Sequence, residues 1–173
     1  MYPSQTKQAL LLPVKGWFIW LTLSLALLVT LIPVGRTPWV PDVLALVLMF
    51  WAVQHPARLG MVAAFVLGLA TDVHQGGLFG QHALAYALLV FFAMVLRRRL
   101  LWYSALQQAL HVLPLFLAAQ LTLLLTGLAG GGVFPGWEIL WAPVFQALLW
   151  PLASWLLLAP QRRAPDQDDS RPI

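Results

Sequence analysis

The stretch that decides the fold is LGMVAAFVLGLATDVHQGGLFGQH, residues Leu59–His82. It starts as an apolar, helix-forming run and ends in a glycine-rich turn. Every fourth position near its start holds a small residue or an acid: Gly60, Ala64, Gly68 and Asp72. On a helix this spacing forms one slowly drifting stripe, and small residues let helices pack closely inside a membrane. The acid at the end of the stripe needs a hydrogen-bonding partner, water or the membrane interface.

The composition is that of an integral membrane protein. Of 173 residues, 61% are hydrophobic and only 9% are charged, and the mean hydropathy is +0.80. A soluble domain is about half apolar and about a quarter charged, and one soluble core of this size cannot bury such an excess. The net charge of +4 does not indicate nucleic acid, because the charges lie between long apolar runs. The chain has no cysteine, which excludes disulfides, thiolate metal sites and cysteine catalysis.

Six apolar segments predict an all-α, six-helix transmembrane bundle, with spans over 16–34, 39–53, 59–71, 78–96, 100–126 and 139–158. The third has only 13 residues before Asp72, too few for a hydrocarbon core of about 30 Å. Either this helix continues past Asp72, or Asp72 lies in a protein-lined recess. The predicted organisation is a cytoplasmic lead-in over 1–15, a transmembrane domain over 16–159 and a disordered tail over 160–173.

The basic residues orient the bundle. With the N-terminus inside, the cytoplasmic side holds Lys7, Lys15, Arg58, Arg97, Arg98, Arg99, Arg162, Arg163 and Arg171. Only Arg36 then lies outside, which satisfies the positive-inside rule with both termini cytoplasmic. The predicted topology anchors are Arg58, Arg97, Arg98, Arg99, Arg162 and Arg163. We expect the triple arginine to contact anionic membrane lipid.

Two acids are the main candidates for chemistry. Asp42 opens the second predicted helix and Asp72 closes the third, so both lie at the same outer membrane level. Asp42 is interpreted either as a helix N-cap or as a recognition or proton site. Asp72 either bonds to the amides of the following glycine turn or binds a partner. The Gly-x-Gly-Asp motif of presenilin-like intramembrane proteases is absent, since the chain reads Leu-Ala-Thr-Asp over 69–72.

No other motif indicates catalysis, a cofactor or a metal. Asp72, His74 and His82 match no standard ligand spacing, and His55 and His111 belong to the opposite half. The zinc-protease, nucleophile-elbow and Walker motifs are absent. A polar arc on the fifth helix, which includes Gln108 and His111, predicts hydrogen bonding inside the bundle or to a partner. The chain is therefore predicted to be non-enzymatic.

Residues 41–90 resemble the MreD family of bacterial rod shape-determining proteins. The pattern is Pro41-Asp42, an apolar run to Trp51, Pro56 and Arg58 in a turn, and then Gly60, Gly68, Asp72, Gly76 and Gly80. The resemblance implies a fold like the six-helix membrane S component of energy-coupling-factor transporters. It also implies a place in the bacterial inner membrane, within the cell-elongation machinery.

The implied function is a scaffold that binds MreC and helps to position enzymes of peptidoglycan synthesis. The wider complex would include MreB, RodZ, RodA and the elongation-specific penicillin-binding transpeptidase. The implied signature, for partner binding or for structure, is Asp42, Gly60, Ala64, Gly68, Asp72, Gly76 and Gly80. An alternative is a substrate-binding membrane component of a vitamin-type transporter, which would have an enclosed outer pocket.

Overall fold

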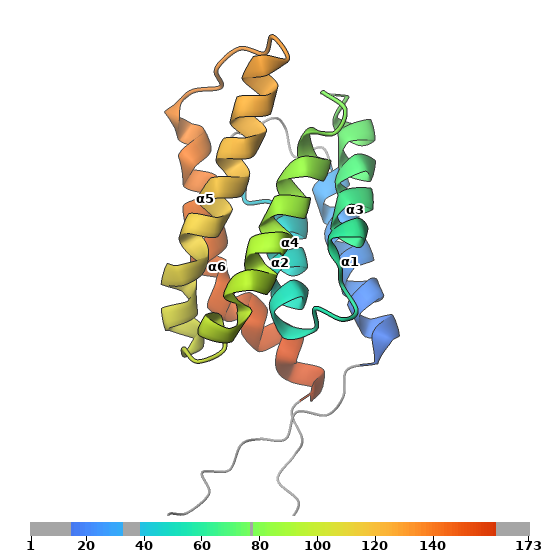
Figure 1. Cartoon of the computed structure of the whole chain (residues 1–173), viewed down its shortest axis with the longest axis vertical. Coiled ribbons are helices and arrows are strands. Elements are labelled where there is room, and N and C mark those ends of the chain that lie inside the picture. The colour runs from blue at the N-terminus through green and yellow to red at the C-terminus, as the bar shows by residue number, and fades with distance from the viewer. Residues whose placement is uncertain (1–14, 33–38, 77, 162–173) are drawn as a thin grey trace, which may run out of the picture.

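The structure is a computed structural model, and it describes residues 15–32, 39–76 and 78–161. Within these ranges the chain is all-α (Figure 1). The six α-helices are α1 (Gly16–Leu31), α2 (Val43–Gln54), α3 (Met61–Gln75), α4 (Gln81–Leu100), α5 (Ala105–Ala129) and α6 (Trp141–Leu158). Two short 3₁₀ helices, η1 (Trp137–Leu140) and η2 (Ala159–Gln161), flank α6.

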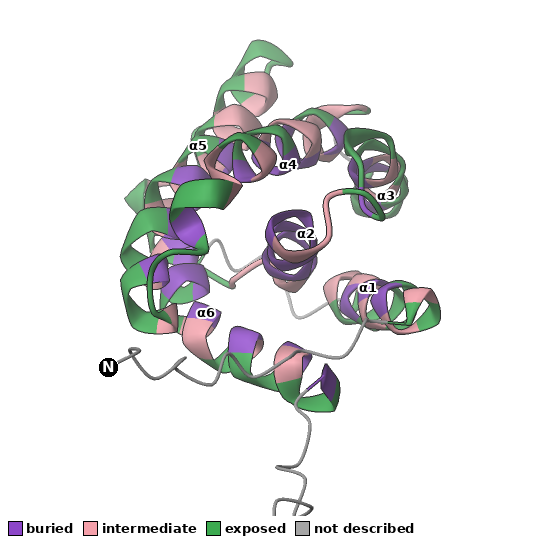
Figure 2. Ribbon diagram, turned by 60° about the horizontal axis from the view of Figure 1, so that its bottom comes forward, coloured by how far each residue is buried: buried purple, intermediate pink, exposed green. Residues whose placement is uncertain are grey.

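Helix α2 is the centre of the bundle, and the other helices surround it (Figure 2). Every residue from Leu44 to Val53 is buried, with 8% or less of its surface exposed. The segment, VLALVLMFWAV, has no polar face, which is typical of a helix surrounded by protein core or by lipid. The 12 residues of α2 span roughly 18 Å, less than the hydrocarbon thickness of a membrane. Protein rather than lipid therefore surrounds this short helix.

Two buried indole groups join pairs of helices, α2 with α1 and α6 with α5, through hydrogen bonds. Trp51 is fully buried, and its Nε1 donates a hydrogen bond to Oγ1 of Thr22 on α1 at 2.9 Å. Trp150 on α6 donates from Nε1 to Oε1 of Gln108 on α5 at 3.0 Å. Buried tryptophans need such a partner for the N–H group, so these pairs fix how the helices face one another.

Helices α3 and α4 form a hairpin with a very close approach. A Cβ atom added to Gly68 would lie 2.4 Å from Cα of Ala83, so only glycine allows the two backbones to come this near. Helix α3 runs through Asp72 to Gln75 and ends at Gly76, which has a left-handed conformation with φ +62°. The first of the two predicted alternatives for the third helix is therefore the one observed.

The helix boundaries differ from the predicted spans in ways that local chemistry explains. Helix α2 begins at Val43 rather than near residue 39, because proline is excluded from a helix interior and Asp42 caps the first turn. Helix α4 begins at Gln81, after the glycine turn, and continues through the three arginines to Leu100. The predicted anchors Arg162 and Arg163, and the predicted tail beyond Gln161, lie outside the described residues.

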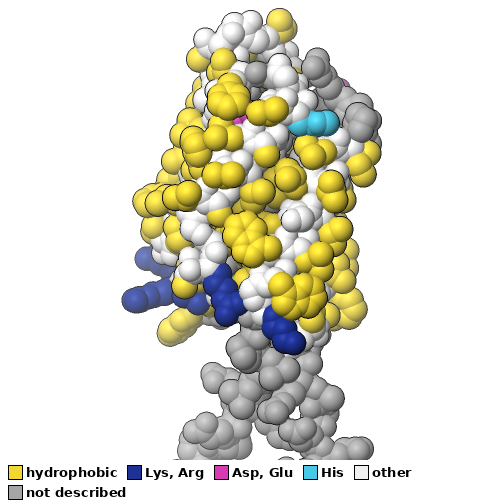
Figure 3. Space-filling view, turned by 90° about the vertical axis from the view of Figure 1, so that its right-hand side faces the viewer, with side chains coloured by type: hydrophobic (Ala, Val, Ile, Leu, Met, Phe, Trp, Pro, Cys, Tyr) yellow, Lys and Arg dark blue, Asp and Glu magenta, His cyan; other side chains and the backbone are white. Residues whose placement is uncertain are grey.

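The exterior combines an apolar middle with a basic end. Figure 3 shows hydrophobic side chains over the middle of one face and Lys and Arg side chains gathered at one end. The helices at Ala105–Ala129 and Trp137–Gln161 are each long and apolar enough to cross a membrane by length and composition. The described part of the chain thus carries membrane-type helices, and α1 begins and α6 ends at the same, basic end (Figure 1).

Candidate functional site

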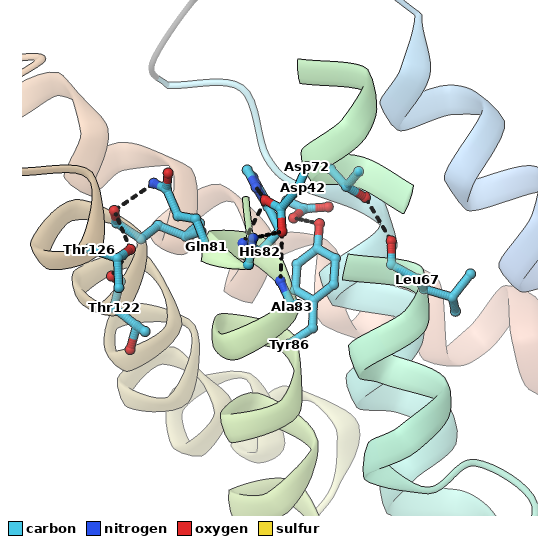
Figure 4. Close-up of polar contacts among 12 residues, drawn as sticks. Asp42, Leu67, Asp72, Gln81, His82, Ala83, Tyr86, Thr122 and Thr126 are labelled. Carbon is cyan, nitrogen blue, oxygen red and sulfur yellow. Dashed lines mark hydrogen bonds and ion pairs between the residues drawn. The ribbon is translucent and has the colours of Figure 1, made fainter. Parts of the chain in front are cut away.

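The carboxylate of Asp72 caps the start of α4 (Figure 4). Its Oδ2 accepts hydrogen bonds from the backbone N–H groups of Gly80 at 2.9 Å and Ala83 at 3.3 Å, and its Oδ1 accepts one from the N–H of His82 at 2.9 Å. These amides belong to the first turn of α4 and have no partner inside the helix. The negative charge also interacts favourably with the helix dipole. Only 3% of Asp72 is exposed, so its charge is used inside the chain.

The side chain of His82 belongs to the same cap. Its Nδ1 lies 2.8 Å from Oδ1 of Asp72, and with the carboxylate ionised this nitrogen carries the proton. The imidazole ring also meets the ring of Tyr86 edge to face, with 5.8 Å between ring centroids. His82 is therefore a hydrogen-bonded member of the site, a role that the sequence, where it was considered as a possible metal ligand, did not predict.

Asp42 ties three helices together at the same end of the bundle. Its Oδ1 accepts the N–H of Ala45 at 3.0 Å, which makes it the N-cap of α2. Its Oδ2 accepts the hydroxyl of Tyr86 on α4 at 2.5 Å. Its backbone carbonyl accepts Nε2 of Gln146 on α6 at 3.0 Å. Asp42 thus fixes the start of the central helix against α4 and α6.

Together these contacts form a partly buried polar cluster that joins the two acids through Tyr86 and His82 (Figure 4). All four carboxylate oxygens accept at least one hydrogen bond from the chain. Their charge and lone pairs serve helix capping and interhelical bonding, which are structural tasks. Among the described residues, no group of three or more His, Cys, Asp or Glu side chains could hold a metal ion.

Sequence reasoning missed Tyr86 and Gln146. Tyr86 lies in an apolar run and looks like any other core aromatic residue. The available signal is its position four residues after His82, which places both on one face of α4. Gln146 is a lone amide in the apolar segment of α6, and a buried amide of this kind requires a partner.

Only part of the predicted small-residue stripe on α3 is buried against another helix. Ala64, Gly68 and Asp72 are buried, and Gly68 packs directly on α4. Gly60, in contrast, is the exposed N-cap of α3 and has open space where a Cβ would lie. The close-packing part of the stripe is therefore covered by this chain's own α4 and is not a free face.

The turn between α3 and α4 closes the site. Gly76 and Gly80, with φ +62° and +96°, adopt backbone conformations that side-chain-bearing residues rarely tolerate. Three apolar side chains around this turn, Val73, Leu78 and Phe79, are exposed, and Phe79 is 68% exposed. We call these three residues the apolar rim. An open groove of about 490 Å³, lined by Trp39, Glu138, Trp141 and Phe145, is a separate feature.

Arginines at the opposite end divide into one inward and two outward side chains. Arg97 donates from Nε to the carbonyl of Val53 at 2.6 Å and from Nη2 to the carbonyl of Gln54 at 3.3 Å. These carbonyls end α2 and lack partners within the helix. Arg98 and Arg99 are exposed. The sequence predicted anchors at all three positions and missed the capping role of Arg97.

His55 lies beside this arginine, directly after α2. Its pKa is lowered from the usual value of 6.5, first by burial and then by the positive charges of Arg58 and Arg97. Its ring contacts Trp51, with 5.8 Å between the ring centroids. The neutral form of His55 is therefore favoured in the folded protein.

The polar arc of the fifth helix has one clear interhelical member. Gln108 is buried, accepts the indole N–H of Trp150 and donates to the carbonyl of Tyr103 at 3.0 Å. His111 is exposed, and its ring stacks on that of Tyr103. Thr122 and Thr126 donate to carbonyls of their own helix.

Comparison with known proteins gives the family. The family model of the rod shape-determining protein MreD matches residues 11–159, a range that includes all six helices. A rod shape-determining protein MreD from Haemophilus influenzae is 29% identical over 130 residues, which cover 73% of this chain and 76% of that protein. No solved structure matches the chain, and the expected likeness to transporter S components stays a prediction. The chain belongs to the MreD family of rod shape-determining proteins.

Proposed function

We propose that this protein is a non-enzymatic scaffold of the bacterial elongation machinery, and that it acts by binding MreC in the inner membrane. Family membership gives the chain a role in rod shape determination. The observation that favours a scaffold is the use of both candidate acids as internal helix caps, with every carboxylate oxygen bonded inside the chain. Carboxylates whose oxygens are all hydrogen-bonded within the chain support a structural role for the two acids and argue against acid–base chemistry.

The proposed topology has both termini in the cytoplasm. All described Lys and Arg residues lie at the end where α1 begins and α6 ends: Lys15, Arg58, Arg97, Arg98 and Arg99. The described acids, Asp42, Asp72 and Glu138, lie in the other half of the bundle. The positive-inside rule then assigns the basic end to the cytoplasm.

The absence of cysteine allows a direct test of this topology by single-cysteine labelling. Val133 is 92% exposed between α5 and η1, and Ala57 is exposed in the turn between α2 and α3, at the basic end. A membrane-impermeant maleimide should label Val133→Cys from the periplasm and Ala57→Cys only after the inner membrane is opened. The reverse pattern would contradict the topology.

The apolar rim is the proposed contact surface for MreC. The small-residue face of α3 is already covered by α4, so a partner segment needs another surface near the acids. Val73, Leu78 and Phe79 surround a turn whose shape is held by the two positive-φ glycines and by the Asp72 cap. A transmembrane or juxtamembrane segment of MreC could bury these exposed side chains at the outer end of the bundle.

Co-purification from detergent with MreC as bait tests this site. We expect Phe79→Ser to recover much less protein than the wild type, whereas Val133→Ser, a matched exposed control in another loop at the same end, should not differ from it. Equal recovery of Phe79→Ser and wild type would exclude the rim as the contact. Failure of the wild type to bind would exclude MreC as a direct partner.

MreB, RodZ, RodA and the elongation-specific penicillin-binding transpeptidase are proposed as members of the wider complex. The transport alternative makes a different prediction, namely a small molecule retained through purification. Mass spectrometry of the purified protein decides between the two: a stoichiometric, vitamin-sized ligand would favour the transporter component.

A further inference from the structure

The last turn of α4 separates one arginine from its two neighbours. Arg97 points inward and binds the carbonyl groups at the end of α2. Successive helical residues are rotated by about 100°, so Arg98 and Arg99 cannot share that direction. Both are exposed at the basic end of the bundle. The end of α4 therefore presents the guanidinium groups of two consecutive residues to its surroundings.

No described acid balances these two charges. Asp42, Asp72 and Glu138 lie in the other half of the molecule, and the ion pair found in the described part of the chain joins His82 and Asp72. Lys15, Arg58 and Arg97 add further positive charge at the same end. Two exposed arginines on consecutive residues in a positive environment attract an external anion, and their planar guanidinium forks suit phosphate oxygens.

The hydrogen-bonded turn that follows adds an exposed aromatic side chain beside the two arginines. The N–H of Leu101 donates to the carbonyl of Arg97 at 3.0 Å, and the N–H of Trp102 donates to that of Arg99 at 3.2 Å, so the chain continues in a tight turn. Trp102 is 90% exposed and lies three residues after Arg99 and four after Arg98. Beside it, Tyr103 stacks on His111 with 4.3 Å between ring centroids. An exposed indole next to apolar Leu101 is typical of the boundary between headgroups and acyl chains.

We propose that the α4–α5 turn is a binding site for an anionic phospholipid. Arg98 and Arg99 hold the headgroup phosphate, and Trp102 lies against the glycerol and upper acyl region of the same lipid. The proposal commits to a lipid rather than a free phosphate, because Trp102 contributes only to a ligand with an apolar part. The inference is independent of MreC binding, since it concerns the opposite end of the bundle.

Native mass spectrometry of the full-length, delipidated protein tests the proposal. The protein is titrated in detergent with phosphatidylglycerol or with phosphatidylcholine of the same acyl chains. We expect the double variant Arg98→Gln/Arg99→Gln to bind phosphatidylglycerol about ten-fold more weakly and to lose the preference over phosphatidylcholine. Trp102→Ala should weaken the binding of both lipids and leave the preference unchanged.

A matched control separates a site from net charge alone. Arg162→Gln/Arg163→Gln removes the same charge from another arginine pair and should keep the preference for phosphatidylglycerol. Equal loss in both double variants, or no loss in either, would overturn the proposal. So would displacement of the lipid by an equal concentration of inorganic phosphate. Arg98→Lys/Arg99→Lys keeps both charges but loses the planar forks, so it should bind phosphatidylglycerol less tightly than the wild type and more tightly than Arg98→Gln/Arg99→Gln.

Discussion

The two ends of the bundle use charge in opposite ways. At one end, Asp42 and Asp72 turn inward and cap the N-termini of α2 and α4. At the other end, Arg97 turns inward to the carbonyl groups that end α2, while Arg98 and Arg99 remain exposed. Unpaired amides at helix starts donate hydrogen bonds to carboxylates, and unpaired carbonyls at helix ends accept hydrogen bonds from basic side chains. Charges beyond those the helix ends require remain available to lipid or to a partner.

The largest loss of stability is expected when Asp72, the inward-facing acid that caps α4, is removed. Asp72→Ala leaves the amides of Gly80, His82 and Ala83 without their acceptor, and we expect a loss of about 3 kcal/mol in stability from these buried donors. Thermal unfolding in detergent measures it. Asp72→Asn keeps one acceptor oxygen and should lose less. Wild-type stability of Asp72→Ala would contradict the capping role.

The second-largest loss of stability is expected at Gly68, where the backbones of α3 and α4 approach each other one turn before Asp72. A methyl group at Gly68 would overlap the backbone of Ala83, so Gly68→Ala should reduce stability by about 2 kcal/mol as α3 and α4 move apart. Gly60→Ala is the matched control on the same stripe, because nothing lies within 4 Å of its added Cβ. The control should lose less than about 1 kcal/mol. Equal losses in the two variants would show that the stripe does not set the helix spacing.

At the basic end, the inward Arg97 and the exposed Arg98 should differ in how much they contribute to stability. Arg97→Gln removes charged hydrogen bonds to Val53 and Gln54 and should cost about 1.5 kcal/mol. Arg98→Gln removes the same charge from an exposed position and should change stability by less than about 0.5 kcal/mol. Thermal unfolding of both variants under the same conditions tests whether only Arg97 acts as a cap. If they unfold alike, Arg97 is not a cap.

The smallest expected effect is the pH dependence contributed by His55. Its folded pKa lies below the unfolded value of 6.5, so the unfolded chain binds a proton first as the pH falls. The stability contribution of His55 is complete above pH 6.5 and is lost as the pH falls toward the folded pKa. Compared with the wild type, His55→Gln should therefore lose less thermal stability between pH 7.5 and 5.5. An identical loss in both proteins would contradict this assignment.

Hydropathy and proline placement were enough to predict six helices and their order. The sequence did not predict which helix is central, because α2 is simply one apolar segment among six until its length is considered. At 12 residues it is too short to face lipid along a full span, and burial from Leu44 to Val53 is the result. Spans can be counted from local composition, but the position of each span in the bundle depends on packing.

The candidate site was only partly predictable for a similar reason. Asp42 and Asp72 were identified, and helix capping was one interpretation of each. For Asp72, the choice between capping and recognition depends on where α4 starts. That start lies at Gly80, which has a positive φ. Tyr86 and Gln146 come from segments 44 and 104 residues away from Asp42, so only the fold brings them together.

Amide hydrogen exchange over residues 78–84 is the most direct test of the internal cap. In the detergent-solubilised wild type, we predict that the amides of Gly80, His82 and Ala83 exchange slowly, because the buried carboxylate of Asp72 holds them. In Asp72→Ala they should exchange quickly, while the peptide over 44–53 in α2 stays protected. Fast exchange of residues 78–84 in the wild type, or unchanged protection in Asp72→Ala, would contradict the account.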